Sequence, residues 1–370
     1  VHRLQLHYTL SRADTMARVR NPLIELLQAV SSEGSISGAA RLLGLSYRHV
    51  WGELKRWENE LGSELVIWEK GQAARLTAFG AKLLWAERQA QARLAPQIES
   101  LRGDLERAFA VAFDPDAHVV TLYASHDEAL TRLREHLQPQ PLHLDIRFCG
   151  SVDAIRGLNE GRCVMAGFHT LQHPAPGSLA ERTYKPLLKP GLHKIIGFAR
   201  RMQGLMVPKG NPMKLLSLPD VIARRARFAN RALGTGTRVV LDELLAQQNL
   251  SPAAIEGFET SEPSHIAAAH AVASGTADAA LGIEIAALAQ GLDFVPLARE
   301  NYHLVCLKSA LDDGPIVALR TVLRSELWRR ELGAIAGYTT ADCGEVLSLR
   351  SVLPWWSFPA RHQGSHSALT

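Results

Sequence analysis

The sequence contains no long apolar run and few cysteines, and both absences narrow the classes of protein that it can encode. No run of about 18 apolar residues occurs, so we predict no membrane-spanning helix and no membrane partner. The four cysteines form no CxxC pair, and no His/Cys cluster has the spacing of a zinc site. Free thiols are typical of a reducing compartment. We therefore expect a cytoplasmic protein that requires no metal and no cofactor.

Composition and charge indicate a globular chain with more than one domain. Its 370 residues, of which 46% are hydrophobic and 21% charged, suffice for two or three domains. The net charge of +4 is too small to indicate nucleic-acid binding by itself. Between Arg41 and Arg56, however, four basic residues accompany a single acidic one, Glu53. Such a cluster is typical of a surface that contacts phosphates, although many basic clusters are merely solvated.

Residues 21–78 are predicted to form a winged helix-turn-helix. Apolar residues at helical spacing predict helices over residues 22–30, 36–43 and 47–61. Gly44 is suited to end the second helix, and Ser46 to cap the third. A helix, a tight turn and a longer amphipathic helix are the elements of this DNA-binding motif.

The basic and polar residues of the third helix lie off its apolar stripe, which predicts that they are free to meet DNA. Residues 65–69 and 75–77 are expected to be strands, with residues 70–74 as the wing between them. The candidate DNA-binding residues are Ser35, Arg41, Ser46, Tyr47, Arg48, His49, Lys55, Arg56, Lys70 and Arg75.

A long helix over residues 79–113 is predicted to follow the wing and to mediate dimerisation. Its apolar residues recur at nearly heptad spacing: Leu83, Ala90, Leu94, Ile98, Leu101, Leu105 and Ala108. A single helix cannot bury such a stripe, so we expect a homodimer or homotetramer. The alternative is a stalk that packs on its own chain. Residues 1–20 are expected to be a disordered leader, and residues 357–370 a disordered tail.

Residues 118–340 alternate between apolar strands and helices, which predicts an α/β domain with parallel strands. Two such sets, with a late return of the chain, predict two facing lobes. We expect lobe I to comprise about 118–198 and 296–340, and lobe II about 199–295.

Ligands of open α/β sheets bind at the carboxyl ends of strands, near helix N-termini, where unpaired N–H groups favour anions. The candidate ligand-binding residues are Ser125, His126, Asp127, Ser151, His169, Arg231, Thr235, Gly236, Thr237, Arg238, His265 and Glu284. Plainer roles remain open: Ser125 and Ser151 as helix caps, His169 as a packed core residue, and Arg238 as a surface residue.

Catalysis is not expected. The glycine-containing segment 230–238 has neither the spacing of a phosphate-binding loop nor that of a dinucleotide fingerprint. Ser125, His126 and Asp127 are adjacent in the sequence, and neighbours on one turn cannot form a relay triad.

Two family resemblances extend this interpretation. Residues 34–79, with GSISGAARLLGLS, ELG and LTAFG, resemble LysR-type and molybdate-responsive (ModE-like) repressor DNA-binding domains. The segment SYRHVW is closer to the molybdate-responsive branch. The resemblance implies that Ser46, Tyr47, Arg48 and His49 face base edges or phosphates.

Residues 119–338 resemble the periplasmic molybdate-binding-like sensor domain that is fused to such regulators, through GSVDAIRGLNEGRCVMAGFH, RFANRALGTGTRVVLDELL and SHIAAAHAVASGTADAALGIE. This resemblance implies a type II solute-binding fold and an anionic effector: molybdate or tungstate, a molybdenum-cofactor-related compound or a small carboxylate. The arginines and histidines suit the larger anions better.

The sequence thus predicts a regulator that binds a double-stranded DNA operator and responds to a small anionic effector. Two alternatives remain at this point. One is a ligand-independent DNA-binding protein whose lobes serve only oligomerisation. The other is an enzyme that acts on a phosphorylated or pterin substrate.

Overall fold

The computed structural model describes residues 22–68, 73–113, 118–137 and 142–356. They form two compact units that meet between Gln91 and Ala92, each of which is described by itself. The predicted leader 1–20, the tail 357–370 and Lys70 lie outside the described residues. Among the described helices, none is both long enough and apolar enough to cross a membrane.

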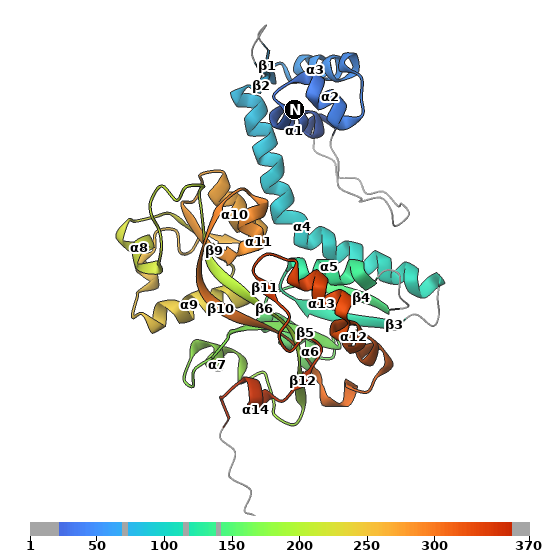
Figure 1. The fold of residues 1–370 in the computed structure, drawn as a ribbon, viewed down its shortest axis with the longest axis vertical. Coiled ribbons are helices and arrows are strands. Elements are labelled where there is room, and N and C mark those ends of the chain that lie inside the picture. The colour runs from blue at the N-terminus through green and yellow to red at the C-terminus, as the bar shows by residue number, and fades with distance from the viewer. Residues whose placement is uncertain (1–21, 69–72, 114–117, 138–141, 357–370) are drawn as a thin grey trace, which may run out of the picture. The chain divides into compact units, whose positions relative to one another are not determined.

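The first unit contains the predicted helix-turn-helix (Figure 1). Its elements are α1 (Pro22–Glu33), α2 (Ile36–Leu43), α3 (Tyr47–Leu61), β1 (Val66–Ile67) and β2 (Arg75–Leu76). Fully buried Leu27, Ala39 and Val50, one from each of the three helices, lie in one apolar core. The first helix is longer than predicted because Ser32 stays in it, with its hydroxyl donating to the Ala29 carbonyl. Both strands are shorter than predicted.

A single helix, α4 (Ala78–Phe113), contains the boundary between the two units. It was predicted from residue 79 as one dimerisation segment. In the structure its first part belongs to the unit of the helix-turn-helix, and residues from Ala92 onward belong to the α/β unit. Pro96 lies inside the helix.

The second unit is built on one mixed sheet that both lobes share. Among the described residues the sheet has ten strands, in the order β4-β3-β5-β10-β6-β9-β7-β8, with β11 and β12 also paired to β6. The strands are β3 (His118–Ala124), β4 (Leu142–Phe148), β5 (Met165–Leu171), β6 (His193–Val207), β7 (Phe228–Arg231), β8 (Ser261–Glu262), β9 (Ala279–Ile283), β10 (Asp293–Leu307), β11 (Tyr338–Thr339) and β12 (Val346–Leu347).

The two longest strands of the sheet make the lobes continuous. Strands β6 and β10, of 15 residues each, pair antiparallel along almost their whole length and run through both lobes (Figure 1). Parallel β3, β4 and β5 flank them in lobe I, and parallel β7, β8 and β9 in lobe II. The lobes are therefore joined by two strands, which places the centre of β6 and β10 between them.

Helices cover both lobes of this sheet. They are α5 (Glu128–Leu137), α6 (Ser151–Asn159), α7 (Leu179–Tyr184), α8 (Leu218–Ala223), α9 (Gly236–Gln247), α10 (His265–Ala273), α11 (Glu284–Ala289), α12 (Gly314–Arg324), α13 (Glu326–Gly333) and α14 (Leu349–Val352). Helices α5, α12 and α13 pack on lobe I around fully buried Trp328, whereas α8 and α9 enclose the apolar core of lobe II.

Candidate functional site

The third helix of the first unit presents the predicted DNA-contacting side chains to solvent. Ser46 caps α3, because its hydroxyl accepts the His49 N–H at 3.2 Å. Val50 and Leu54 are buried, while Tyr47, Arg48 and His49 are exposed. Gly44 ends α2 in the left-handed conformation at φ +66°, as predicted. The local sequence therefore fixes which face of α3 is free.

The predicted basic residues fall into two groups. Lys55 pairs with Glu58 at 2.7 Å, and Arg56 pairs with Glu53 at 2.5 Å. Arg41, Arg48 and Arg75 are exposed, and among the described residues they form no ion pair. These three guanidinium groups are thus available to phosphates or base edges, whereas Lys55 and Arg56 must leave a partner first. Ser35 is the cap of α2, accepting from the Gly38 N–H at 2.9 Å.

Glu58 holds α3 against the first strand of the wing. This buried carboxylate accepts the N–H groups of Leu65 at 2.9 Å and Val66 at 3.3 Å. Burial acts to raise the pKa of Glu58, but the hydrogen bonds from Lys55, Leu65 and Val66 outweigh it and lower the pKa. The apolar stripe of α3 therefore contains a carboxylate that periodicity alone does not explain.

Between the lobes of the second unit, Arg201 lies at the centre of a buried polar cluster. Its guanidinium donates to the carboxylates of Asp127 and Glu300 and lies 3.2 Å from Nδ1 of His169. The Tyr338 hydroxyl also donates to Asp127, at 2.6 Å. Arg201 and Glu300 are register partners on β6 and β10. The cluster is therefore built on the two strands that join the lobes.

The cluster continues from Glu300 into lobe II through Gln203. The amide nitrogen of Gln203 donates to Glu300 at 2.9 Å and to the Thr237 hydroxyl at 3.2 Å. The Thr237 hydroxyl lies 3.3 Å from Nε2 of His265. All four residues are buried. Because Asp127 and His169 come from lobe I, the chain of contacts joins both lobes.

Arg231 is a buried cation whose guanidinium binds backbone only. At the end of β7 it donates to the carbonyls of Glu262 at 3.2 Å and Pro263 at 3.0 Å, and its Nη1 has no partner among the described residues. No carboxylate in the described part of the chain forms an ion pair with it. Burial, with the charge of Arg201, lowers the pKa of Arg231 to about 9, so it is a cation at neutral pH.

The histidines of the cluster are neutral at neutral pH. Burial, together with the charges of Arg201 and Arg231, lowers the pKa of His169 and of His265 well below the usual range. Burial raises the pKa of Glu300 against the opposing influence of Arg201. A neutral imidazole offers one donor and one acceptor, so these rings can serve either kind of ligand group.

Several buried polar atoms in this region have no hydrogen-bond partner among the described residues. They are Ser125 Oγ, His169 Nε2, Gln203 Oε1, Arg231 Nη1, His265 Nδ1 and Glu300 Oε2. A buried polar group without a partner costs free energy, and a cluster of them marks a place that a ligand or water completes. Four of these six residues, Ser125, His169, Arg231 and His265, are among the predicted ligand-binding residues.

The lobes are in contact at this site. A side chain on Gly150 would meet the Gly234 carbonyl at 2.8 Å, and one on Gly236 would meet the His169 ring at 2.5 Å. The Val152 N–H also donates to the Gly234 carbonyl, at 3.4 Å. Gly150 in lobe I and Gly236 in lobe II therefore allow the two lobes to approach each other closely.

Five of the predicted ligand-binding residues have other contacts. Arg238 stacks over the Phe258 ring at 4.0 Å and pairs with Asp242 at 3.1 Å. Thr235 caps α9. The others are Ser151, which lies beside the Tyr184 hydroxyl, His126, which packs on Phe148, and Glu284, which lies against Gly337. At these five positions, the side chain makes a structural contact, such as a helix cap, an ion pair or a ring contact.

Sequence reasoning missed Arg201, Gln203, Glu300 and Tyr338. Arg201 and Gln203 lie two residues apart, and so on one face of a strand, which was the available signal. Their partners come from remote segments, so the sequence could not show that they meet. No group of three or more His, Cys, Asp or Glu side chains in the described part of the chain is placed to hold a metal ion.

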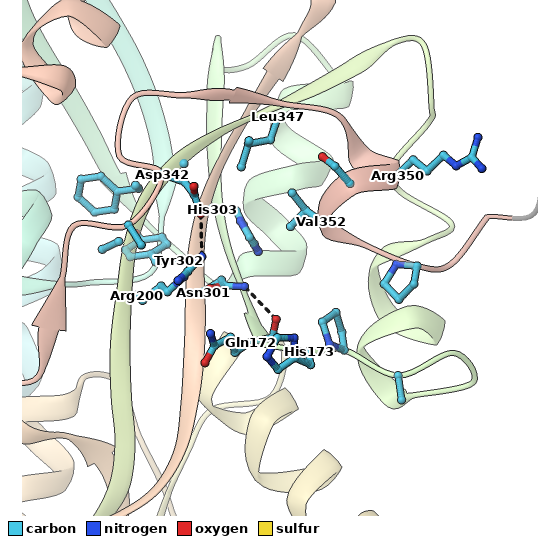
Figure 2. A pocket seen from close by; sticks show the side chains of 18 residues that line it. Gln172, His173, Arg200, Asn301, Tyr302, His303, Asp342, Leu347, Arg350 and Val352 are labelled. Atoms are coloured by element: carbon cyan, nitrogen blue, oxygen red, sulfur yellow. Dashed lines mark hydrogen bonds and ion pairs between the residues drawn. The ribbon is translucent and has the colours of Figure 1, made fainter.

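A separate cavity of about 670 Å³ opens beside β6 and β10 in lobe I. Figure 2 shows its side chains, which include the Arg200–Asp342 ion pair at 2.8 Å and the hydrogen bond from Asn301 to the Gln172 carbonyl. None of the predicted ligand-binding residues lines it. Arg200 and Arg201 lie on opposite faces of β6. Arg200 lines this cavity, whereas Arg201 belongs to the cluster between the lobes.

A helix-turn-helix continuous with a helix that leads into a two-lobed α/β domain defines the class: a DNA-binding transcriptional regulator with an effector-binding domain. Family models agree with this class. Residues 134–324, more than half of the chain, match the PBP superfamily domain, and residues 23–81 match the bacterial regulatory helix-turn-helix protein, lysR family. The chain therefore belongs to the PBP superfamily and carries a lysR-family regulatory helix-turn-helix; such regulators are not enzymes.

Known relatives cover different parts of the chain. The chain is 31% identical over 240 residues to the uncharacterized protein YvgK of Bacillus subtilis, and the aligned region spans 63% of this chain and 75% of that protein. It is 35% identical over 95 residues to the molybdenum-pterin-binding protein MopB of Rhodobacter capsulatus, spanning 25% and 35%. Among solved structures, a Corynebacterium glutamicum OxyR C206 mutant aligns at 15% identity and TM-score 0.43, spanning 85% and 93%.

Proposed function

We propose that this regulator acts in the cytoplasm, binds a DNA operator through α3, and senses a small anionic effector between the lobes of its second unit. The observation that carries the effector proposal is Arg231. Arg231 is a buried cation that forms no ion pair with a carboxylate among the described residues. Its Nη1 has no hydrogen-bond partner among them either. A buried cation without an ion-pair partner is costly, so a bound anionic group would complete its contacts.

The DNA-binding proposal rests on the exposed face of α3. Arg48 and His49 follow the Ser46 cap, at the helix N-terminus that enters the major groove in helix-turn-helix proteins. The free guanidinium of Arg48 suits a guanine edge or a phosphate. We propose the same role for Tyr47 and for the nearby Arg41 and Arg75, whose side chains are also exposed.

The DNA-binding proposal is tested with Arg48→Ala on duplexes selected from a random library by the wild-type protein. We expect the variant to bind about 5- to 150-fold more weakly, because one base contact contributes about 1–3 kcal/mol. Arg88→Ala, an exposed arginine of α4, is the matched control and should bind as the wild type does. Equal loss in both variants would show that general charge, not α3, determines affinity.

The effector proposal is tested by thermal unfolding with molybdate, tungstate, phosphate, formate, small carboxylates and pterin carboxylates. The similarity to a molybdenum-pterin-binding protein favours the inclusion of the pterins. A native-state ligand stabilises by about 2.7 kcal/mol at a hundredfold excess over its dissociation constant. We expect at least one anion to raise the midpoint, and Arg231→Gln to abolish that shift while DNA binding persists. A shift that survives in Arg231→Gln would place the site elsewhere.

We further propose that the protein is a homodimer or a higher oligomer through α4. Leu94, Ile98, Leu101 and Leu105 are 41%, 41%, 55% and 37% exposed, at steps of four, three and four residues. That spacing is a coiled-coil seam, which a second copy of the helix would bury. Leu101→Glu should lower the sedimenting mass, whereas Arg88→Glu on the same helix should not.

A further inference from the structure

The unpartnered atoms of the interlobe site include acceptors as well as donors, and this restricts its ligand. Arg231 Nη1 and Ser125 Oγ can donate to an anion. Gln203 Oε1 and Glu300 Oε2, by contrast, can only accept from a neutral or cationic group. A ligand that supplies only acceptors would leave both of these oxygens buried and unsatisfied.

The charges of the cluster point the same way. Arg201 is compensated by the two carboxylates that it bridges, Asp127 and Glu300. Counted together, Arg201 and Arg231 balance Asp127 and Glu300, so the site tolerates a ligand of low charge better than a dianion. Arg231 forms no ion pair among the described residues, so its guanidinium is the group that can bind the anionic end of a ligand. A bare dianion would bring its second charge close to the carboxylate of Glu300, where repulsion is strong because the group is buried away from water.

We infer that the interlobe site takes a small anion of single charge that also carries hydrogen-bond donors, as an amino, hydroxyl or ring N–H group does. The anionic group binds Arg231, and the donors bind Gln203 and Glu300. This inference rests on the proposed effector site, because it names the chemistry of that site. It disfavours molybdate and tungstate themselves as effectors.

Calorimetric titration of the full chain with matched probes tests the inference. Propionate and lactate share a carboxylate, a single negative charge and a three-carbon skeleton but differ in the hydroxyl donor at C2; molybdate and pterin-6-carboxylate complete the set. We expect a donor-bearing probe to bind at least tenfold more tightly than propionate and molybdate. Glu300→Gln should reduce that preference, because the amide brings its own donor.

The outcomes separate this inference from the proposed function. Arg231-dependent binding of molybdate or propionate, as tight as that of the donor-bearing probes, would overturn the inference and leave the anion site standing. No Arg231-dependent binding of any probe would overturn both. A preference for donors that persists undiminished in Glu300→Gln would also contradict the assigned contacts.

A second inference rests on different contacts, those of α4 with the two lobes. On one side of Pro96, the guanidinium of Arg93 binds both oxygens of Glu262 at 2.7 and 3.1 Å. Glu262 is 4% exposed and ends β8 of lobe II. Arg93 thus fastens the helix to lobe II through a carboxylate that has little access to water.

Pro96 creates a second attachment to lobe II. Proline lacks an N–H, so the carbonyl four residues earlier, that of Ala92, receives no helical hydrogen bond. The Ser264 hydroxyl donates to this carbonyl at 3.2 Å. Ser264 also caps α10, accepting the Ala267 N–H at 3.0 Å. The hydrogen bond that the proline removes from the helix is therefore replaced by one from a lobe II residue.

On the other side of Pro96 the helix is attached to lobe I. The Phe148 N–H, at the end of β4, donates to the Ser100 hydroxyl at 3.1 Å. The Glu99 carboxylate accepts from Thr131 at 3.2 Å and from Arg134 at 3.4 Å. A Cβ on Gly103 would lie 3.6 Å from Asp145. Both lobes thus hold one helix, on opposite sides of its proline.

We propose that α4 fastens the two lobes together and that opening of the lobes breaks its lobe II contacts at Arg93 and Ala92. The helix runs without interruption from the end of the wing, so any change in its attachment acts on the segment that leads to the helix-turn-helix. Pro96 lies between the two attachments, where a helix bends most readily.

Electron–electron distance measurements on the full chain test this proposal. Spin labels are placed at Glu160→Cys in lobe I and Gln248→Cys in lobe II, both exposed, in a Cys149→Ser background. We expect Arg93→Gln to increase the population of longer distances at least twofold. Arg132→Gln, which removes an exposed pair with Glu128 inside lobe I, is the matched control and should leave the distribution unchanged.

A second variant keeps the test decisive if Arg93→Gln folds poorly. Pro96→Ala restores the N–H that competes with Ser264 for the Ala92 carbonyl, and we expect it to shift the distances in the same direction. Distributions identical to that of the wild type in both variants would overturn the proposal. A shift of equal size in Arg132→Gln would do so too, because it would not depend on the helix contacts.

Discussion

Replacement of Arg201 by methionine tests whether the interlobe cluster depends on one buried cation. Arg201 is 2% exposed, and its guanidinium bridges the carboxylates of Asp127 and Glu300, which are also buried. Methionine fills much of the same volume but leaves both charges without a cation. We expect the second unit to lose stability by far more than an exposed ion pair contributes.

The magnitude follows from the burial. Removal of one partner from a buried ion pair costs about 3–5 kcal/mol, and here one cation serves two carboxylates, so the upper part of that range applies. With a denaturant slope of about 3 kcal/mol per molar, a loss of about 4–5 kcal/mol should lower the urea midpoint by about 1.3–1.7 M. Arg200→Met is the matched control: its exposed pair with Asp342 should contribute about 1 kcal/mol or less.

The deficit of Arg201→Met should depend on pH in a defined direction. Burial already raises the pKa of the Glu300 carboxyl, and loss of the Arg201 guanidinium removes the charge that opposes this rise. Groups with a raised folded pKa stabilise the fold below the unfolded pKa, and that stabilisation is lost as pH rises. The variant should therefore approach the wild type near pH 4 and fall furthest behind it above pH 7.

Equilibrium urea unfolding at several pH values measures both effects. Asp127→Asn and Glu300→Gln added to Arg201→Met should recover much of the lost stability, because they remove the stranded charges. A loss below about 1 kcal/mol at pH 7, or one that is independent of pH, would refute the account of the cluster as a charge-compensated core.

Two further predictions concern the first unit. Glu58→Gln should cost about 1–3 kcal/mol at neutral pH, because it replaces charged hydrogen bonds to Leu65 and Val66. The pKa of Glu58 is lowered on folding, so this stabilisation is present above the unfolded pKa and is lost as pH falls below about 4. Wild type and variant should therefore converge when urea unfolding is measured at acid pH. Leu27→Ala should cost about 2–5 kcal/mol in thermal unfolding, because the side chain is fully buried, whereas Leu42→Ala at a 60% exposed position should change little; comparable losses would contradict the assigned core.

Much of the first unit follows from local sequence. Helical spacing, the Ser46 cap and the Gly44 stop depend on residues a few positions apart, so the pattern alone placed α2 and α3 and their free face. Glu58 is the exception. Its carboxylate is satisfied by backbone N–H groups seven and eight residues later, which no helical period reveals.

The α/β class and Arg231 were also predictable, because alternating strands and helices and a basic residue at a strand end are local features. The single continuous sheet was not. Strand β6 pairs with β10, whose residues lie about a hundred positions away, and only that pairing shows that the lobes share strands.

The sequence by itself thus determined the elements, their order and the exposed basic face of α3, because those depend on short-range periodicity and caps. Only the tertiary structure decided the site between the lobes. Arg201 meets Asp127 across 74 positions and Glu300 across 99, and Ser264 reaches the Ala92 carbonyl across 172. Such contacts depend on which strands pair and which helix packs where, and the free energy of that choice is distributed over the whole core.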